Sequence, residues 1–230
     1  MSSQIPRDGH PARVLRPSRS LGASLAPALL TAILAGCGGS GAGSSSGASA
    51  SAGAGAGGRS GFAGTALTPL KSAPPLALRN YLGDRVALPR LRGKAVLVTF
   101  LYTHCVDVCP LITANLRAVM EKLGPTARET RIVAVSVDPR GDTKQSVSAF
   151  LRAHGMTGRM KYLIGSAAEL TPVWKAWHVA AVRDPTNNTL VTHSSVTYGV
   201  SSTGKLMTIY GPSFEPAQIV HDVPALLTGN

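Results

Sequence analysis

The stretch that decides the fold is KAVLVTFLYTHCVDVCPLITANLRAVMEKL, residues 94–123. It begins with an apolar run, Ala95–Leu101, which is long enough for one fully buried strand. A short polar loop and two cysteines, Cys105 and Cys109, follow, and after Pro110 the apolar residues recur at helical spacing. Proline is tolerated in a first helical turn because the N–H that it lacks would have no partner there. The stretch therefore predicts strand, loop and helix, with both sulfurs near the helix N-terminus.

Two cysteines in this position have several chemical uses. The helix dipole and the free N–H groups favour negative charge, so a thiol there ionises more easily. The thiolate is the form that attacks disulfides and binds soft metals. At this spacing Cys105 and Cys109 are able to close a disulfide or to hold one ion. They are too few for a structural zinc site, which normally needs four ligands, and two cysteines that are merely buried are the remaining interpretation.

Residues 1–36 are predicted to be an export signal. Four arginines precede an apolar run, Leu21–Ile33, which is short for a membrane span and ends in small residues. Leu34-Ala35-Gly36-Cys37 resembles the lipobox of bacterial lipoproteins, which implies that Cys37 is lipidated and becomes the mature N-terminus. An ordinary cleaved signal or a short uncleaved anchor is the alternative. The expected location is the bacterial cell envelope, with a lipid anchor in a membrane and the domain outside the cytoplasm.

Composition divides the remainder of the chain into two parts. Residues 37–66 are mostly glycine, serine and alanine, which predicts a flexible tether after the lipidated cysteine. Residues 67–230 have a suitable length for one domain with one core. The chain holds three cysteines, so assigning Cys37 to lipid leaves Cys105 and Cys109 as a pair. The formal charge of +12 lies partly in the signal, and no basic helix or aromatic-studded stripe indicates a nucleic-acid partner.

Strands and helices are expected to alternate through the domain. A hairpin is expected within Leu76–Leu91, around Gly83-Asp84. The elements expected after the cysteine helix are strand Arg131–Val137, a helix capped by Thr143 and running to about His154, strand Lys161–Ile164, helix Ala167–Trp177, strands Val191–Val200 and Lys205–Tyr210, and helix Pro216–Leu227. This order indicates an α/β domain whose sheet is covered on both faces.

A cysteine pair after a central strand, in this order of elements, resembles the thioredoxin superfamily. The spacing here is Thr-His-Cys-x-Asp-x-Cys-Pro, and Val137-Asp138-Pro139-x-x-Asp142-Thr143 and a histidine before the penultimate strand follow. Together these motifs resemble the Sco/SenC family over about residues 70–228. The resemblance implies a thioredoxin-like fold, with a central mixed sheet flanked by helices and an N-terminal hairpin.

The resemblance also implies a metal site. In the Sco/SenC family two cysteines and one distant histidine bind copper, which by position implies Cys105, Cys109 and His193 as ligands. Two thiolates suit Cu(I), and an added imidazole gives a site that also holds Cu(II). Asp107 and Asp138 are candidates for tuning the site, or are a helix cap and a turn residue. Val106 stands where the family often has proline. This difference removes no ligand.

The other histidines have structural explanations, with one exception. His104 adjoins Cys105 and is the strongest rival ligand. His154 ends an expected helix, where a cation is favourable, and His178 is expected to be packed in an apolar stretch.

Two functions remain open. Family members help to assemble the dinuclear copper site of cytochrome c oxidase, which implies a copper-binding metallochaperone for the copper-site subunit or for another copper chaperone. The alternative is an enzyme, a thiol–disulfide oxidoreductase that cycles a Cys105–Cys109 disulfide and reduces those partners. The presence of His193 favours the metallochaperone, because thiol exchange does not strictly need an imidazole. A peroxiredoxin-like peroxidase fits poorly, because its Thr-x-x-Cys site is absent here.

Overall fold

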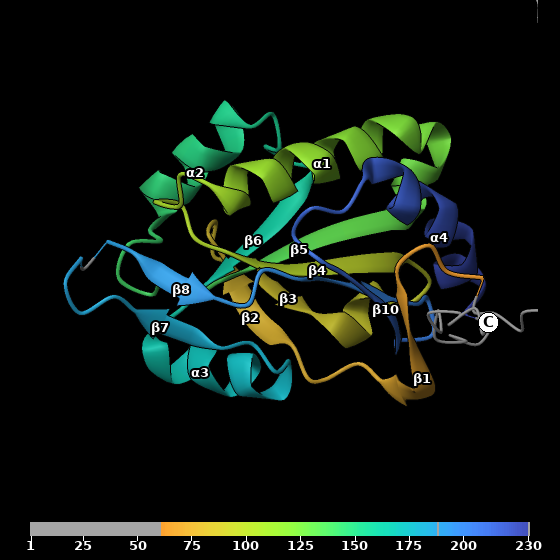
Figure 1. The fold of residues 1–230 in the computed structure, drawn as a ribbon, viewed down its shortest axis with the longest axis horizontal. Helices are drawn as coiled ribbons and strands as arrows, with labels where there is room; N and C mark the ends of the chain where they lie inside the picture. The colour runs from red at the N-terminus through yellow and green to blue at the C-terminus, as the bar shows by residue number, and fades with distance from the viewer. Residues whose placement is uncertain (1–60, 188, 230) are drawn as a thin grey trace, which may run out of the picture. The chain divides into compact units, whose positions relative to one another are not determined.

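The structure is a computed structural model that describes residues 61–187 and 189–229. The predicted export signal, Cys37 and most of the predicted tether lie outside the described residues. Within them, a mixed eight-stranded sheet has the order β1-β10-β9-β4-β5-β6-β2-β3, and helices cover both of its faces (Figure 1). The fold is thioredoxin-like, as the sequence predicted.

The strands of the main sheet are β1 (Thr65–Ser72), β2 (Ala77–Asn80), β3 (Arg85–Ala87), β4 (Ala95–Leu101), β5 (Thr130–Ser136), β6 (Met160–Ile164), β9 (Thr197–Val200) and β10 (Lys205–Tyr210). A separate two-stranded sheet consists of β7 (Ala181–Arg183) and β8 (Val191–His193). The helices are α1 (Val108–Lys122), α2 (Lys144–Ala153), α3 (Ala167–Ala176) and α4 (Pro216–Thr228), with 3-10 turns at Leu88–Leu91 and Gly124–Glu129.

The predicted buried strand is the centre of the sheet. All seven residues of β4 are buried, and β4 runs parallel to β5 and antiparallel to β9. A strand buried on both faces needs such a continuous apolar run. Helices α1 and α2 connect β4, β5 and β6 in turn and lie with α4 on one face, while α3 covers the other (Figure 1). Helix α1 begins beyond the carboxyl end of β4, and the cysteines therefore lie at that edge of the sheet.

Two local predictions are confirmed. The hairpin β2–β3 turns at Gly83, whose φ of 98° suits glycine, and the Asn80 side chain accepts the N–H groups of Leu82 and Asp84. Thr143 caps α2, because its hydroxyl accepts the Ser146 N–H at 3.1 Å. The helix then ends at Ala153, one residue before the expected His154.

The prediction of one strand over Val191–Val200 is wrong. The Ser194 N–H donates to the Ala180 carbonyl and the Ser194 hydroxyl accepts the Ala180 N–H, which turns the chain between β8 and β9. Strand β8 pairs with β7, which has only three residues and therefore too little pattern to be expected. His193 thus lies at the end of a small hairpin and not within the main sheet.

Residues just before position 67, the predicted start of the domain, already make contacts with it. Strand β1 starts at Thr65, and the N–H groups of Ala63 and Gly64 donate to the Asp222 carboxylate at 2.7 and 2.9 Å. Asp222 is fully buried and also accepts the Tyr210 hydroxyl at 2.7 Å. A buried carboxylate needs such donors, and here the backbone of the preceding segment supplies two of them.

The expected packing of His178 is also wrong. Its φ of 53° places it in the left-handed region just after α3, where the side chain is exposed. A residue in this conformation commonly ends a helix, and the backbone then turns the side chain outward. None of the helices in the described ranges is long and apolar enough to cross a membrane.

Candidate metal and thiol site

The two cysteines lie where the sequence placed them. Cys109 is in the first turn of α1 and Cys105 is in the loop before it, and both side chains are free thiols. The Cys109 N–H donates to the Cys105 Sγ at 3.3 Å. The Cys109 residue is fully buried, whereas 7% of the Cys105 surface remains exposed. The first N–H groups of a helix have no partner within the helix, and one of them, that of Cys109, is donated to the Cys105 sulfur.

The fold brings His193 to the same place. Its Nε2 lies 3.8 Å from the Cys109 Sγ, although the two residues are 84 positions apart in the sequence. The other ring nitrogen, Nδ1, lies 3.2 Å from the Ser194 carbonyl oxygen, a contact that suits an Nδ1–H donor. Burial lowers the pKa of His193, which favours the neutral ring. A neutral imidazole held in this tautomer presents an Nε2 lone pair on the side of the cysteines.

Tyr102 connects the two halves of the site, and no motif in the sequence singled it out. Its ring lies edge-on to the His193 ring, with centroids 5.7 Å apart and an interplanar angle of 84°. Burial is the largest cause that raises the pKa of Tyr102, so its hydroxyl keeps its proton.

The two thiols are electrostatically unequal. The hydrogen bond from the Cys109 side chain, followed by those from the Cys109 and Asp107 backbone, lowers the pKa of Cys105 to about 6 despite its burial. The same side-chain hydrogen bond, together with burial, raises the pKa of Cys109 well above its usual value. The two sulfurs share one proton, which stays on Cys109 and leaves Cys105 as the thiolate. Cys105 is therefore the more reactive sulfur.

This inequality predicts a pH dependence in the reduced, metal-free protein. Thiolate absorbance at 240 nm should rise with pH through a midpoint near 6, since Cys105 is protonated below that pH and ionised above it. Cys105→Ala should abolish this step. Cys109→Ala should move the midpoint upward toward the usual value of about 8.5, because the Cys105 thiolate loses the side-chain hydrogen bond. A first step near 8.5 in the parent would contradict the assignment.

The candidate tuning residues Asp107 and Asp138 occupy different environments. Asp107 is exposed at the N-cap position of α1, but its side chain makes no capping hydrogen bond. Asp138 is buried just after β5, and its Oδ1 accepts the N–H groups of Arg140 and Gly141 at 3.1 and 3.0 Å. Asp138 is therefore a turn residue, and it also forms an ion pair with Arg183.

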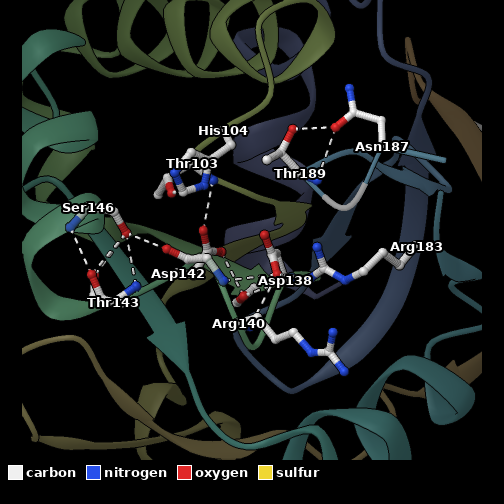
Figure 2. A network of polar contacts seen from close by, with 12 residues as sticks. Thr103, His104, Asp138, Arg140, Asp142, Thr143, Ser146, Arg183, Asn187 and Thr189 are labelled. Carbon is white, nitrogen blue, oxygen red and sulfur yellow. Dashed lines mark hydrogen bonds and ion pairs between the residues drawn. The ribbon is translucent and has the colours of Figure 1, made fainter. Parts of the chain in front are cut away.

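Asp142 supports the cysteine loop from below, as the close view shows (Figure 2). Its carboxylate accepts the Thr103 N–H at 2.8 Å, the Ser136 hydroxyl at 2.6 Å and the Tyr162 hydroxyl at 2.9 Å. Burial raises the pKa of Asp142, while these donors act in the opposite direction. The motif that contains Asp142 was visible in the sequence, but this role depends on residues from β5 and β6.

His104, the rival ligand, is exposed and lies on the side of the Asp138 turn. Its Nδ1 is 3.5 Å from the Thr103 hydroxyl, and a Cβ added to Gly141 would lie 2.8 Å from the same Nδ1. Glycine at position 141 therefore leaves room for both His104 and Asp138 over the turn.

The arrangement of Cys105, Cys109 and His193 is open. In the part of the chain that the structure describes, no three histidine, cysteine or carboxylate side chains already surround a common metal position. A sulfur at about 2.3 Å and a nitrogen at about 2.0 Å from one ion are about 3.5–3.7 Å apart at tetrahedral or trigonal angles. The observed 3.8 Å between Cys109 and His193 is close to that separation, so these residue types fit a soft metal after small side-chain movements.

Comparison with known protein families finds a match over the part of the chain that contains the candidate site. The family model described as SCO1/SenC matches residues 67–228. This chain belongs to the SCO1/SenC family. The match runs from within β1 to the end of α4 and includes every residue of the candidate site.

Curated relatives and solved structures agree with this membership. The SCO1 protein homolog of Bacillus subtilis is 29% identical over 138 residues, which are 59% of this chain and 72% of that protein. The chain spans only about half the length of the mitochondrial relatives that it matches, 45% for one from Arabidopsis thaliana and 50% for one from Homo sapiens.

Two solved structures are similar in fold. ScoI from Arabidopsis thaliana, solved with copper bound, has a TM-score of 0.61 and 27% identity, covering 70% of this chain and all of that one. BsSco, described as a member of the Sco family of cytochrome c oxidase assembly proteins with a disulfide switch, has a TM-score of 0.59 and 27% identity. The structural match covers 70% of this chain and 96% of BsSco.

Proposed function

We propose that this protein binds one copper ion through Cys105, Cys109 and His193 and delivers it as cargo. The observation that carries the proposal is the 3.8 Å approach of the Cys109 sulfur to the His193 Nε2 across 84 residues of sequence. The copper-bound ScoI structure, which shares this fold, supports copper as the metal. Sulfur ligands favour Cu(I), and the imidazole extends the site to Cu(II).

The recipient that we propose is the dinuclear copper site of cytochrome c oxidase, reached directly or through another copper chaperone. Membership of the SCO1/SenC family and the description of BsSco as an assembly protein support this partner. The site suits transfer by ligand exchange, because Cys105 lies in a loop and keeps 7% of its surface exposed, whereas Cys109 is fully buried. An incoming thiolate from the recipient is able to replace Cys105 while the buried Cys109 still holds the ion.

A thiol–disulfide oxidoreductase is the second candidate, and the inequality of the two thiols favours it. Cys105 has its pKa lowered to about 6 and serves as the attacking sulfur, and the adjacent Cys109 resolves the mixed disulfide. In that exchange the Cys105 sulfur bonds to one sulfur of the substrate disulfide, and the other sulfur leaves as a thiolate. Cys109 then closes the Cys105–Cys109 bond and releases the reduced partner.

A titration separates the two candidates. The reduced, metal-free chain is titrated with Cu(I) against a competing chelator, and in a parallel assay it is mixed with a disulfide-bonded peptide. Tight binding of one copper per chain with slow peptide reduction supports the metallochaperone. Weak copper binding with rapid stoichiometric reduction would transfer the proposal to the oxidoreductase.

We further propose that Cys37 is lipidated and that the glycine-, serine- and alanine-rich segment after it, predicted to run to about residue 66, tethers the domain to a membrane of the bacterial cell envelope. The lipobox-like sequence before Cys37 supports the anchor. Cys37→Ser should release the protein from the membrane fraction, with Cys105→Ser as the matched control that stays anchored. Membrane retention of Cys37→Ser would contradict the proposal.

A further inference from the structure

The hairpin that carries His193 stands apart from the main sheet. Within the described residues, β8 pairs with β7 and with no strand of the eight-stranded sheet. The chain turns away at Ser194 before β9 joins the main sheet. His193 is therefore outside the backbone ladder that fixes β4, and contacts made by the hairpin's own side chains contribute to its position relative to Cys109.

Arg183 and His193 share the inner face of this hairpin. In the register of the pair, Ala181 lies opposite His193 and Arg183 lies opposite Val191. Successive side chains of a strand point to opposite faces, so these residues face one way. Val182 points the other way and is 63% exposed. A contact that holds the Arg183 side chain therefore also holds the hairpin face on which His193 lies.

The Arg183 guanidinium forms an ion pair with Asp138, as Figure 2 shows. The Asp138 side chain is 2% exposed and the Arg183 side chain 23% exposed, so the pair is largely shielded from water. Asp138 is fixed independently, because its carboxylate accepts the Arg140 and Gly141 N–H groups and its own N–H donates to the Ser136 hydroxyl. The hairpin is thereby tied to a rigid point at the carboxyl end of β5, which runs parallel to β4.

We propose that the Arg183–Asp138 ion pair is a clasp that positions His193 against the cysteines. Arg183 is a positioning residue, since it acts through the hairpin and holds no metal. Charge-assisted hydrogen bonds in a shielded place are stronger and more directional than exposed ones, which suits a fixed distance between two elements. The Tyr102 ring packs edge-on against the His193 ring of β8, and the clasp holds β7. The consequence for copper rests on the proposed function, whereas the consequence for the hairpin does not.

The first test measures hydrogen exchange in the metal-free, reduced protein. Arg183→Met should speed exchange of the β7–β8 amides by about tenfold or more, with the β4 and β5 amides unchanged. Arg140→Met is the matched control, because Arg140 is exposed, lies two positions from Asp138 and directs its guanidinium away from it (Figure 2). Arg183→Lys should restore part of the protection, since a lysine keeps the charge but not the forked geometry. Equal exchange in Arg183→Met and Arg140→Met would overturn the clasp.

The second test is a double-mutant cycle on Cu(I) affinity. If Arg183 acts through His193, Arg183→Met weakens binding in the parent but changes the affinity of the His193→Ala variant by less than about twofold. Equal losses in the two backgrounds would overturn the clasp, because Arg183 would then act independently of His193. If His193→Ala binds copper as tightly as the parent, the proposed ligand set fails, and hydrogen exchange alone still decides whether the clasp exists.

Removal of Arg183 alone leaves a buried carboxylate without its cation, which destabilises the fold independently of any effect on the hairpin. The double variant Asp138→Asn/Arg183→Met removes both charges and keeps an oxygen for the Arg140 and Gly141 N–H groups. It should show the same rapid exchange of the β7–β8 amides. Parent-like protection of those amides in the double variant would also overturn the proposal.

Discussion

Cu(I) binding should weaken by about 100-fold or more in Cys109→Ser and by about 10- to 100-fold in His193→Ala. A four-ligand zinc site binds with about 10–16 kcal/mol, or about 3 kcal/mol per ligand, and 1.4 kcal/mol corresponds to a factor of ten. Cys109 is expected to matter most, because it is fully buried and its sulfur lies 3.8 Å from the His193 Nε2. Competition with a Cu(I) chelator at fixed pH and under reducing conditions measures the change.

The matched control for this prediction is His104→Ala. His104 adjoins Cys105 in sequence, but it is exposed and lies over the Asp138 turn. Its removal should change Cu(I) affinity by less than about twofold. A loss in His104→Ala as large as that in His193→Ala would reverse the choice of histidine.

Trp177→Ala should lower the free energy of unfolding by about 3–5 kcal/mol, the range for buried tryptophan or phenylalanine replaced by alanine. Trp177 is 1% exposed and its ring lies 6.1 Å from that of Phe100 and 5.2 Å from that of Tyr198. Its indole N–H donates to the Pro75 carbonyl, and the Tyr198 hydroxyl donates to the Trp177 carbonyl. Denaturant unfolding of the reduced, metal-free chain measures the loss.

Two further variants sharpen this stability prediction. Trp177→Phe keeps most of the buried volume and should lose clearly less than Trp177→Ala. Trp174→Ala, in the last turn of α3 just before Trp177, removes a half-buried side chain and should also lose less, even though its indole N–H donates to the Ser136 carbonyl. A loss below about 1.5 kcal/mol in Trp177→Ala would contradict the central place given to this side chain.

The parts of the fold that the sequence predicted are those with a strong local signal. The apolar run of β4, the Thr143 cap and the Gly83 turn are each encoded within a few neighbouring residues, and the structure has all three. Strands β1 and β7 were missed, because β1 is largely exposed and β7 has only three residues. The break at Ser194 depends on hydrogen bonds to Ala180, and no local pattern announces such a contact.

In the candidate site, too, some residues have a local sequence signal and others are brought together only by the fold. Cys105 and Cys109 follow from a local motif, whereas His193 was named through the family resemblance, because only the fold brings it beside Cys109. Tyr102 and Arg183 gave no comparable signal. Their roles arise from contacts between elements far apart in the chain, the Tyr102 ring with His193 and the Arg183 guanidinium with Asp138.

The most direct measurement of the proposed copper site is X-ray absorption at the copper edge of the Cu(I)-loaded protein. The proposed site predicts two sulfur neighbours and one nitrogen neighbour per copper, with the nitrogen lost in His193→Ala and one sulfur lost in Cys105→Ser. A copper atom surrounded only by nitrogen and oxygen, or an unchanged spectrum in His193→Ala, would contradict it.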